Sequence, residues 1–425
     1  MGWSKNVVCA LAILFFLEAY GIISLFHYVP SVTYLSNKVY LGAKSIIQSK
    51  TPPSDPFANA INQTPPHHLS FMNDLQGRPL FVFGDSTVDA GNFNITKFPY
   101  GLDAPENFPK RFSNHYSIAD HLAVKMQTPI PRAFNSLGVD ELKKNVNINF
   151  ASGGCGLLPT THPLECTTFA DQVIQFQTST TKNEDLGRSV FFISVGANDF
   201  VFSFNGKDSE KFAVGLVGRL ETYLKALYSC GGARIFIVNN IAPVGCIPDK
   251  RNRTTNECDE VLNKSIHVYN KLLVQTLKKF KNEHDVLMYL ADSDKMYSEI
   301  RKARLSFGFT EIYKPCCGEW EPLMRMFWCD ETARYCDRRT EFLFFDGAHT
   351  THEANRIFVE HCFAANLEED CFRQEQDVVN IDLQATLEVG RRLGVAFGEK
   401  DVHNIKKMIE LEAKDLAILQ RGSST

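Results

Sequence analysis

The sequence lacks an excess of positive charge: 45 lysine and arginine residues face 49 aspartate and glutamate residues, for a net charge of −4. Such a chain offers no basic field to a phosphate backbone, so nucleic acid is not expected as a partner. The sequence also lacks internal repeats. With 44% hydrophobic and 22% charged residues it has a globular composition, and its 425 residues suffice for one large domain or two smaller ones.

The cysteines lack the spacing of a zinc site. A structural zinc built from Cys316, Cys317, Cys329 and Cys336 is the alternative to disulfides, but none of them forms a C-x2-C knuckle. We therefore expect disulfides, no metal and no cofactor. Eleven cysteines follow the N-terminal segment, so at least one is free or joined to another chain.

The N-terminus has the form of a secretory signal. Lys5 precedes an eleven-residue apolar stretch, Val7 to Leu17. After Glu18 the chain is apolar again to Phe26, and no small-x-small cleavage site stands out. Residues 1–27 are thus a signal peptide or an uncleaved signal anchor, and membrane contact is expected only if residues 7–26 stay as that anchor.

Four N-x-S/T sequons support entry into the secretory pathway, at Asn62, Asn94, Asn252 and Asn263. The sequence accordingly predicts a glycosylated protein that is secreted, held in the endomembrane lumen, or anchored through its N-terminal segment. The oligomeric state is left open.

The rest of the chain divides by composition. Residues 28–78 form a leader that includes a proline-rich linker, with five prolines between Thr51 and Ser70. We expect residues 79–366 to form the main globular domain, and residues 367–425 a charged, helical C-terminal extension.

Within the domain, short apolar runs alternate with helical patterns. Five strands are expected, at 80–83, 146–150, 190–195, 234–238 and 286–290. Five helices are expected, at Tyr116–Met126, Thr168–Thr178, Phe212–Tyr228, Asp259–Lys281 and Thr351–Ala365. The alternation predicts a three-layer α/β/α domain with a central, mostly parallel, five-stranded sheet.

Three of these strands end in polar, glycine-containing turns that carry Ser86, Gly154 and Asn198. Parallel strands share one carboxyl edge, so a hydroxyl nucleophile, a closely approachable backbone N–H and an amide donor would meet there. Asp346 and His349 supply a carboxylate that can orient an imidazole base.

Four blocks together resemble the plant GDSL esterases/lipases of the SGNH hydrolase superfamily: FGDSTVDAGNF (83–93), NINFASGGCGLL (147–158), SVGANDF (194–200) and FFDGAHTTHEAN (344–355). The resemblance implies that Ser86 is the nucleophile, His349 the base and Asp346 its orienting carboxylate. It also implies an oxyanion hole made by Ser86 N–H, Gly154 N–H and the Asn198 side chain.

Two positions depart from the family pattern. Thr87 replaces the leucine of GDSL, at a position expected to lie outside the chemistry, and Thr350 stands where a proline commonly follows the histidine. Asp85 and Asp199 are expected to be structural acceptors of turn N–H groups, and His352 a surface residue.

We expect a serine esterase or lipase that hydrolyses small-molecule or lipid esters through an acyl-enzyme on Ser86. Two alternatives stay open: an acyltransferase that uses the same site, and a binding or scaffolding protein on a catalytically retired hydrolase fold. The intact five-residue set argues against the second.

Overall fold

The computed structural model describes residues 74–363, apart from 94–97, 143–146, 162–165, 180–185, 230 and 322–325. The predicted signal or anchor, Asn62, Asn94 and the C-terminal extension all lie outside the described residues. No helix in the described ranges is long and apolar enough to cross a bilayer.

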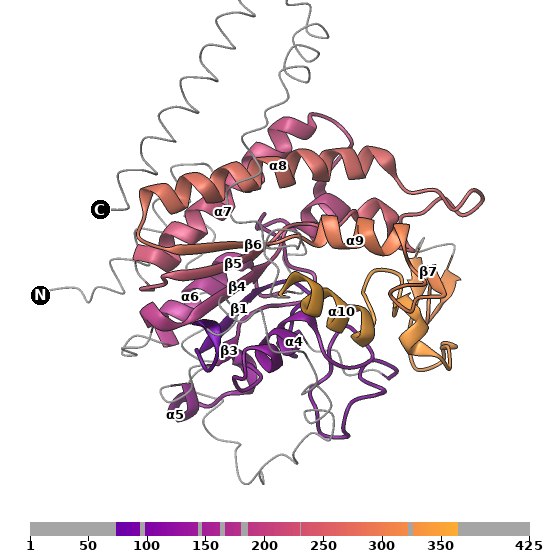
Figure 1. Cartoon of the computed structure of the whole chain (residues 1–425), viewed down its shortest axis with the longest axis horizontal. Coiled ribbons are helices and arrows are strands. Elements are labelled where there is room, and N and C mark those ends of the chain that lie inside the picture. The colour runs from indigo at the N-terminus through magenta and orange to yellow at the C-terminus, as the bar shows by residue number, and fades with distance from the viewer. Residues whose placement is uncertain are drawn as a thin grey trace, which may run out of the picture. The chain divides into compact units, whose positions relative to one another are not determined.

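A parallel sheet forms the centre of the domain, with strand order β2-β3-β1-β4-β5-β6 (Figure 1). Its strands are β1 (Leu80–Gly84), β2 (Arg132–Ala133), β3 (Ile148–Asn149), β4 (Val190–Ser194), β5 (Ile235–Asn239) and β6 (Leu287–Ala291). The five expected strands are present. The predicted number is one short, because the edge strand β2 has only two residues and therefore shows no sequence period.

The helices are α4 (Ile118–Lys125), α5 (Val139–Leu142), α6 (Phe169–Ser179), α7 (Ser209–Ser229), α8 (Glu260–Glu283), α9 (Ser293–Lys302) and α10 (His352–Cys362). Short 3-10 helices cover Phe134–Ser136, Leu186–Arg188, Val244–Cys246 and Arg339–Glu341, and a π-helix covers Asp199–Ser203. Helix α9 was not predicted. It begins where Asp292 accepts the backbone N–H of Lys295, a side-chain N-cap.

Two hydrophobic cores explain the three layers. Alternate strand residues such as Phe81, Phe191 and Phe236 pack with α6, α7 and α8 on one face. Their neighbours, such as Val82 and Phe192, pack with α4, α9 and α10 on the other. Strands that are buried on both faces consist of continuous apolar runs, and for this reason they could be predicted from the sequence. The three-layer α/β/α prediction is confirmed.

A disulfide-bonded region follows α9. It contains β7 (Glu311–Pro315), β8 (Glu319–Glu321), β9 (Met326–Trp328) and β10 (Phe342–Phe344), with β7 paired to β10 and β8 to β9. Disulfides join Cys316 to Cys336 and Cys317 to Cys329, so the zinc alternative for these four cysteines is wrong. A third disulfide joins Cys246 and Cys258.

Candidate active site

Ser86 stands just beyond the carboxyl end of β1, on a turn that depends on Gly84. The backbone of Gly84 has φ +151°, and a Cβ there would lie 2.0 Å from the carbonyl oxygen of Ser194. The N–H of Asp85 donates to that same carbonyl at 3.1 Å. Only glycine permits this close approach, which turns the chain so that Ser86 reaches the carboxyl edge of the sheet.

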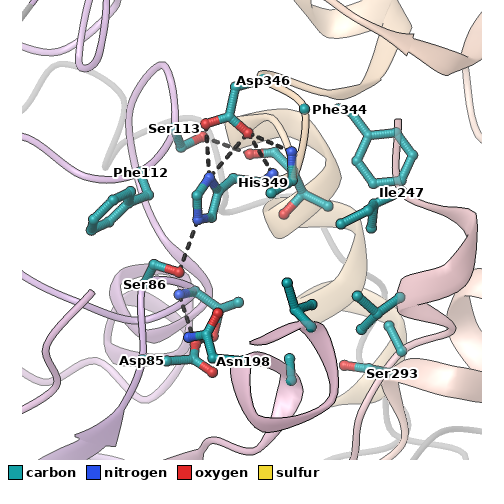
Figure 2. A pocket seen from close by; sticks show the side chains of 18 of the residues that line it. Asp85, Ser86, Phe112, Ser113, Asn198, Ile247, Ser293, Phe344, Asp346 and His349 are labelled. Carbon is teal, nitrogen blue, oxygen red and sulfur yellow. Dashed lines mark hydrogen bonds and ion pairs between the residues drawn. The ribbon is translucent and has the colours of Figure 1, made fainter. Parts of the chain in front are cut away.

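His349 lies between Ser86 and Asp346, as Figure 2 shows. Nε2 of His349 is 2.8 Å from Ser86 Oγ, and Nδ1 is 2.7 Å from Asp346 Oδ2. Asp346 Oδ1 also accepts the backbone N–H groups of Ala348 and His349, which folds the turn between β10 and α10. Because an ionised carboxylate only accepts, Nδ1 carries the proton and Nε2 is left to accept from the serine hydroxyl.

Asp346 and His349 each stabilise the charged form of the other. Burial by itself favours neutral groups, but the neighbouring His349 outweighs it and holds the pKa of Asp346 below its ordinary value. Burial likewise opposes a charged imidazole, but the charge and hydrogen bond of Asp346 outweigh it and raise the pKa of His349 above 6.5. The arrangement therefore stabilises an imidazolium, the species formed when the serine proton is taken.

Gly154 and Asn198 border the same pocket as Ser86. The N–H of Gly153 is occupied, since it donates to Asp89 Oδ2 at 2.8 Å. Gly154, in the left-handed region with φ +79°, follows it at the pocket wall. Asn198 directs one amide N–H to the carbonyl of Cys155 at 2.9 Å, which leaves its second N–H to serve a ligand.

Asp85 and Asp199 are acceptors of turn N–H groups, as expected. Asp85 Oδ1 accepts the N–H of Thr87, and Asp199 accepts those of Leu157 and Leu158. Both carboxylates are buried.

Thr87, the residue in place of the family's leucine, is held by its neighbours: its hydroxyl donates to Asp85 Oδ1 at 2.7 Å and lies 3.0 Å from Ser194 Oγ. One expectation requires correction. His352 is not a surface residue. Its Nδ1 accepts the N–H of Tyr116 and lies 3.2 Å from His121 Nε2, because the start of α10 packs against α4.

Two further residues at the site were not predicted, because no motif or spacing marks them. The hydroxyl of Tyr100 donates to Asp346 Oδ2 at 2.5 Å. Asp249 contacts the turn that carries Asp346 and His349, since its N–H donates to the carbonyl of Gly347. Its Oδ1 accepts the N–H of Phe327. Burial raises the pKa of Asp249 to about 6.

The pocket around Ser86 has a volume of about 760 Å³ and is lined mainly by apolar side chains. Among the described residues, no cluster of histidine, cysteine, aspartate or glutamate side chains has the arrangement of a metal site.

Two sequons lie in the described ranges. Asn252 is exposed in a turn and accepts the N–H groups of Thr254 and Thr255. Asn263 is half-buried in α8, where its side chain accepts from Gly245 N–H and donates to Cys246 Sγ.

Comparison with known proteins agrees with this geometry. The family model described as GDSL-like Lipase/Acylhydrolase matches residues 80–362. GDSL esterase/lipase At5g55050 of Arabidopsis thaliana is 32% identical over 320 residues, which cover 66% of this chain and 84% of that protein. GDSL esterase/lipase At1g71691 of the same plant is 28% identical over 336 residues, covering 71% and 86% respectively.

Among solved structures, Est24, a carbohydrate acetylesterase from Sinorhizobium meliloti, is similar at 11% identity and a TM-score of 0.32, covering 66% of this chain and 94% of that chain. A TM-score this low carries no weight in the assignment. The family model and the curated relatives span most of the described domain, and on them the chain belongs to the GDSL-like lipase/acylhydrolase family, as a relative of the plant GDSL esterases/lipases.

Proposed function

We propose that this carboxylic ester hydrolase works through Ser86 as nucleophile, His349 as general base and Asp346 as the carboxylate that orients it. The observation that carries the proposal is the continuous contact from Ser86 Oγ to His349 Nε2 at 2.8 Å and from Nδ1 to Asp346 at 2.7 Å. These are the distances that nucleophile activation requires.

The reaction proceeds in two steps. As Ser86 Oγ bonds to the ester carbonyl carbon, its proton passes to His349 Nε2. The ester C–O bond then breaks, and the proton leaves with the alcohol. Water next attacks the acyl-enzyme, again giving its proton to His349, and the carboxylic acid is released as Ser86 is regenerated.

The N–H groups of Ser86 and Gly154 and the free amide N–H of Asn198 form the oxyanion hole in this proposal. Support comes from Gly153, whose N–H is already bound to Asp89, so that Gly154 is the glycine with an N–H to offer. Each such donor contributes about 2.7–4 kcal/mol to transition-state stabilisation.

The substrates that fit are small-molecule esters of lipid or secondary-metabolite type, because the pocket is lined mainly by apolar side chains. No cofactor takes part in the proposed steps. Secretion or residence in the endomembrane lumen is supported by the three disulfides, which persist in oxidising compartments. Of the two described sequons we assign a glycan to Asn252 only, because its side chain is exposed.

The test is hydrolysis of p-nitrophenyl butyrate by the purified chain, with wild type, Ser86→Ala and Ser306→Ala side by side. Ser306 is exposed and lies outside the pocket, so its variant controls for the loss of a serine hydroxyl. We expect Ser86→Ala alone to lose activity and labelling by a fluorophosphonate. Equal activity of Ser86→Ala and wild type would refute the serine mechanism.

The acyltransferase alternative uses the same acyl-enzyme, with an alcohol in place of water. Product analysis in the presence of an acceptor alcohol separates the two: hydrolysis yields the free acid, transfer yields a new ester. Absence of turnover and of fluorophosphonate labelling in the folded wild type would favour a binding protein on a retired fold.

A further inference from the structure

One part of the pocket, here called the inner arm, is bordered by residues of α9, α10 and β10 as well as by the carboxyl edge of the sheet. Ser293 of α9 and Phe344 of β10 are labelled in Figure 2. Its walls are apolar side chains, of which Ile118, Met296, Ile300, Phe344 and Phe358 are buried and Ile247 is half-buried. Met296 is only 1% exposed and Phe358 7%, so these walls of the arm belong to the core of the domain.

The polar residues that border the arm bond to one another. Ser293 Oγ donates to Asn239 Oδ1 at 2.7 Å, and Asn239 Nδ2 donates to Ser194 Oγ at 3.1 Å. Ser194 Oγ lies 3.0 Å from the hydroxyl of Thr87, which donates to Asp85. Each hydroxyl in this row has a protein partner, so the arm places little demand on a ligand for polar groups.

The other side of the pocket is open. Phe202 is 56% exposed at the rim, and Met326 and Phe327 of β9 are half-buried there beside Asp249. The pocket therefore has one enclosed apolar end and one end that faces solvent.

We propose that the inner arm holds the acyl chain of the ester and that the alcohol lies toward the open rim. This inference rests on the proposed two-step mechanism. In that mechanism the alcohol departs first and water enters while the acyl group stays bonded to Ser86. A group in the enclosed end cannot leave past the acyl-enzyme, whereas a group at the rim can. The substrates are thus esters of apolar carboxylic acids.

Ile300 is positioned to limit the length of the chain. Helix α9 begins at Ser293, which bonds to the sheet edge through Asn239, and Ile300 lies seven residues further along. At 1.5 Å per residue this is roughly 10 Å from the sheet edge. The side chain of Ile300 is 3% exposed and borders the arm.

The test measures kcat/KM for p-nitrophenyl acetate, butyrate, octanoate and laurate. For wild type we expect a rise of up to about fourfold per methylene until the arm is full, the ratio that corresponds to burying one methylene. Ile300→Phe should keep the acetate value within about twofold and lose at least tenfold on octanoate. Ile300→Ala should move the optimum to a longer chain, and it remains informative if the larger side chain prevents folding.

Leu305→Phe is the matched control, because Leu305 is 68% exposed and does not border the pocket. An unchanged chain-length profile in both Ile300 variants, or equal losses on acetate and octanoate, would overturn the proposal. Ethyl octanoate and octyl acetate test the side: a selective loss on octyl acetate in Ile300→Phe would place the alcohol in the arm. Hydrolysis of the acetate ester by the wild type, and its loss in Ser86→Ala, do not depend on any of these outcomes. A failure of the acyl-arm proposal can therefore be distinguished from a failure of the proposed function.

Discussion

The hydroxyl of Tyr100 donates to Asp346 Oδ2 at 2.5 Å, and the same oxygen accepts the Nδ1 proton of His349 at 2.7 Å. Tyr100 thus shares the carboxylate that would orient His349 as the proposed base. Burial, together with the charge of Asp346, raises the pKa of the Tyr100 hydroxyl far above 10, so it stays a donor.

Replacing Tyr100 by phenylalanine should move the acid limb of kcat/KM to higher pH. Without this donor Asp346 is a stronger base, which strengthens its hold on the His349 proton and raises the histidine pKa further. Loss of a hydrogen bond to a charged group should also cost about 1.5–3 kcal/mol of stability. The measurement is the pH dependence of kcat/KM in the variant and in wild type. An acid limb at the same pH in both would mean that Tyr100 contributes packing only.

The wild-type enzyme should lose activity as the pH falls through a value above 6.5. The base must be neutral to accept a proton, and the pKa of His349 is raised by Asp346 against the effect of burial. Asp346→Asn should lower activity on the order of 10⁴-fold, because the imidazole loses its orienting acceptor. Rates from pH 5 to 9 test both points; a limb below pH 6 in wild type would contradict the first.

Asp89 should position the oxyanion hole. Its buried carboxylate accepts four backbone N–H groups, from Gly91, Asn92, Phe93 and Gly153. The bond from Gly153 holds the loop in which Gly154 is the next residue. Asp89→Asn should lower kcat by up to about 100-fold with little change in KM, since a 1 Å displacement affects the transition state most.

The matched control for this variant is Asp171→Asn. Asp171 is also an aspartate engaged with its own backbone turn, through Thr168 at the start of α6, but it lies away from the pocket. Equal effects of the two substitutions on kcat would indicate general destabilisation in place of positioning.

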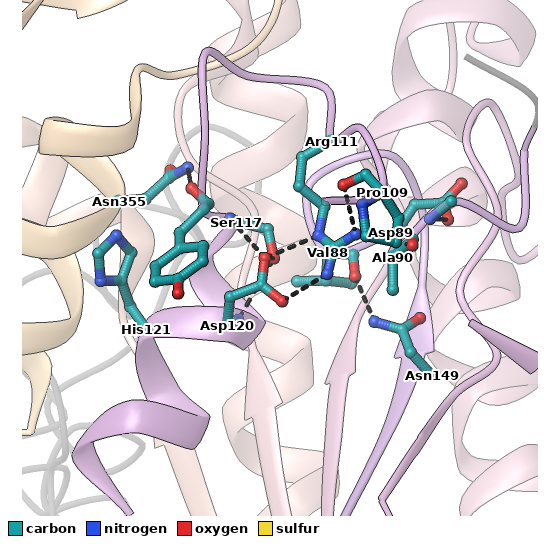
Figure 3. A network of polar contacts seen from close by, with 12 residues as sticks. Val88, Asp89, Ala90, Pro109, Arg111, Ser117, Asp120, His121, Asn149 and Asn355 are labelled. Carbon is teal, nitrogen blue, oxygen red and sulfur yellow. Dashed lines mark hydrogen bonds and ion pairs between the residues drawn. The ribbon is translucent and has the colours of Figure 1, made fainter. Parts of the chain in front are cut away.

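Removing one partner of the buried ion pair of Arg111 and Asp120 should strongly destabilise the domain (Figure 3). Two bonds of 2.8 and 2.9 Å join the side chains, which are 3% and 1% exposed. Asp120→Ala leaves a buried, unpaired guanidinium and should cost about 3–5 kcal/mol. In the half-exposed pair of Arg132 and Glu141, Glu141→Ala should cost less than about 1 kcal/mol. Urea denaturation of both variants makes the comparison.

The histidines between α4 and α10 should make the domain less stable in acid. Burial, then the neighbouring histidine, lowers the pKa of His121 to about 3, and that of His352 is lowered to about 4. Unfolded histidines protonate near 6.5, so the unfolded state binds more protons below that pH, and stability falls as the pH drops from 6.5 toward 4 and 3.

His352→Asn should reduce this loss, because its amide oxygen can still accept the N–H of Tyr116 without titrating. The groups that face the cluster are His115, Asp120, Asp103, Glu353 and Arg356. Asp89, Asp199 and Asp249, whose pKa values burial raises to about 6, act in the opposite direction between pH 6 and 3.8. The measurement is the melting temperature of variant and wild type at pH 7 and pH 5. The same fall in melting temperature in both proteins would contradict the prediction.

The sequence by itself determined the layers and the residues that meet at one edge of the sheet. Strands buried on both faces are continuous apolar runs, and parallel strands end at a common edge, so Ser86, Gly154 and Asn198 were placed by chain order alone. Asp346 and His349 are three residues apart, and a local turn joins them.

Only the tertiary structure decided which distant residues complete the site. Tyr100 reaches Asp346 across 246 positions, and Thr87 meets Ser194 across 107. His352 is covered because α10 packs on α4, and the inner arm exists because α9 and β10 close over the sheet edge. None of these contacts leaves a local period in the sequence, since the free energy that selects them comes from burial between elements far apart in the chain.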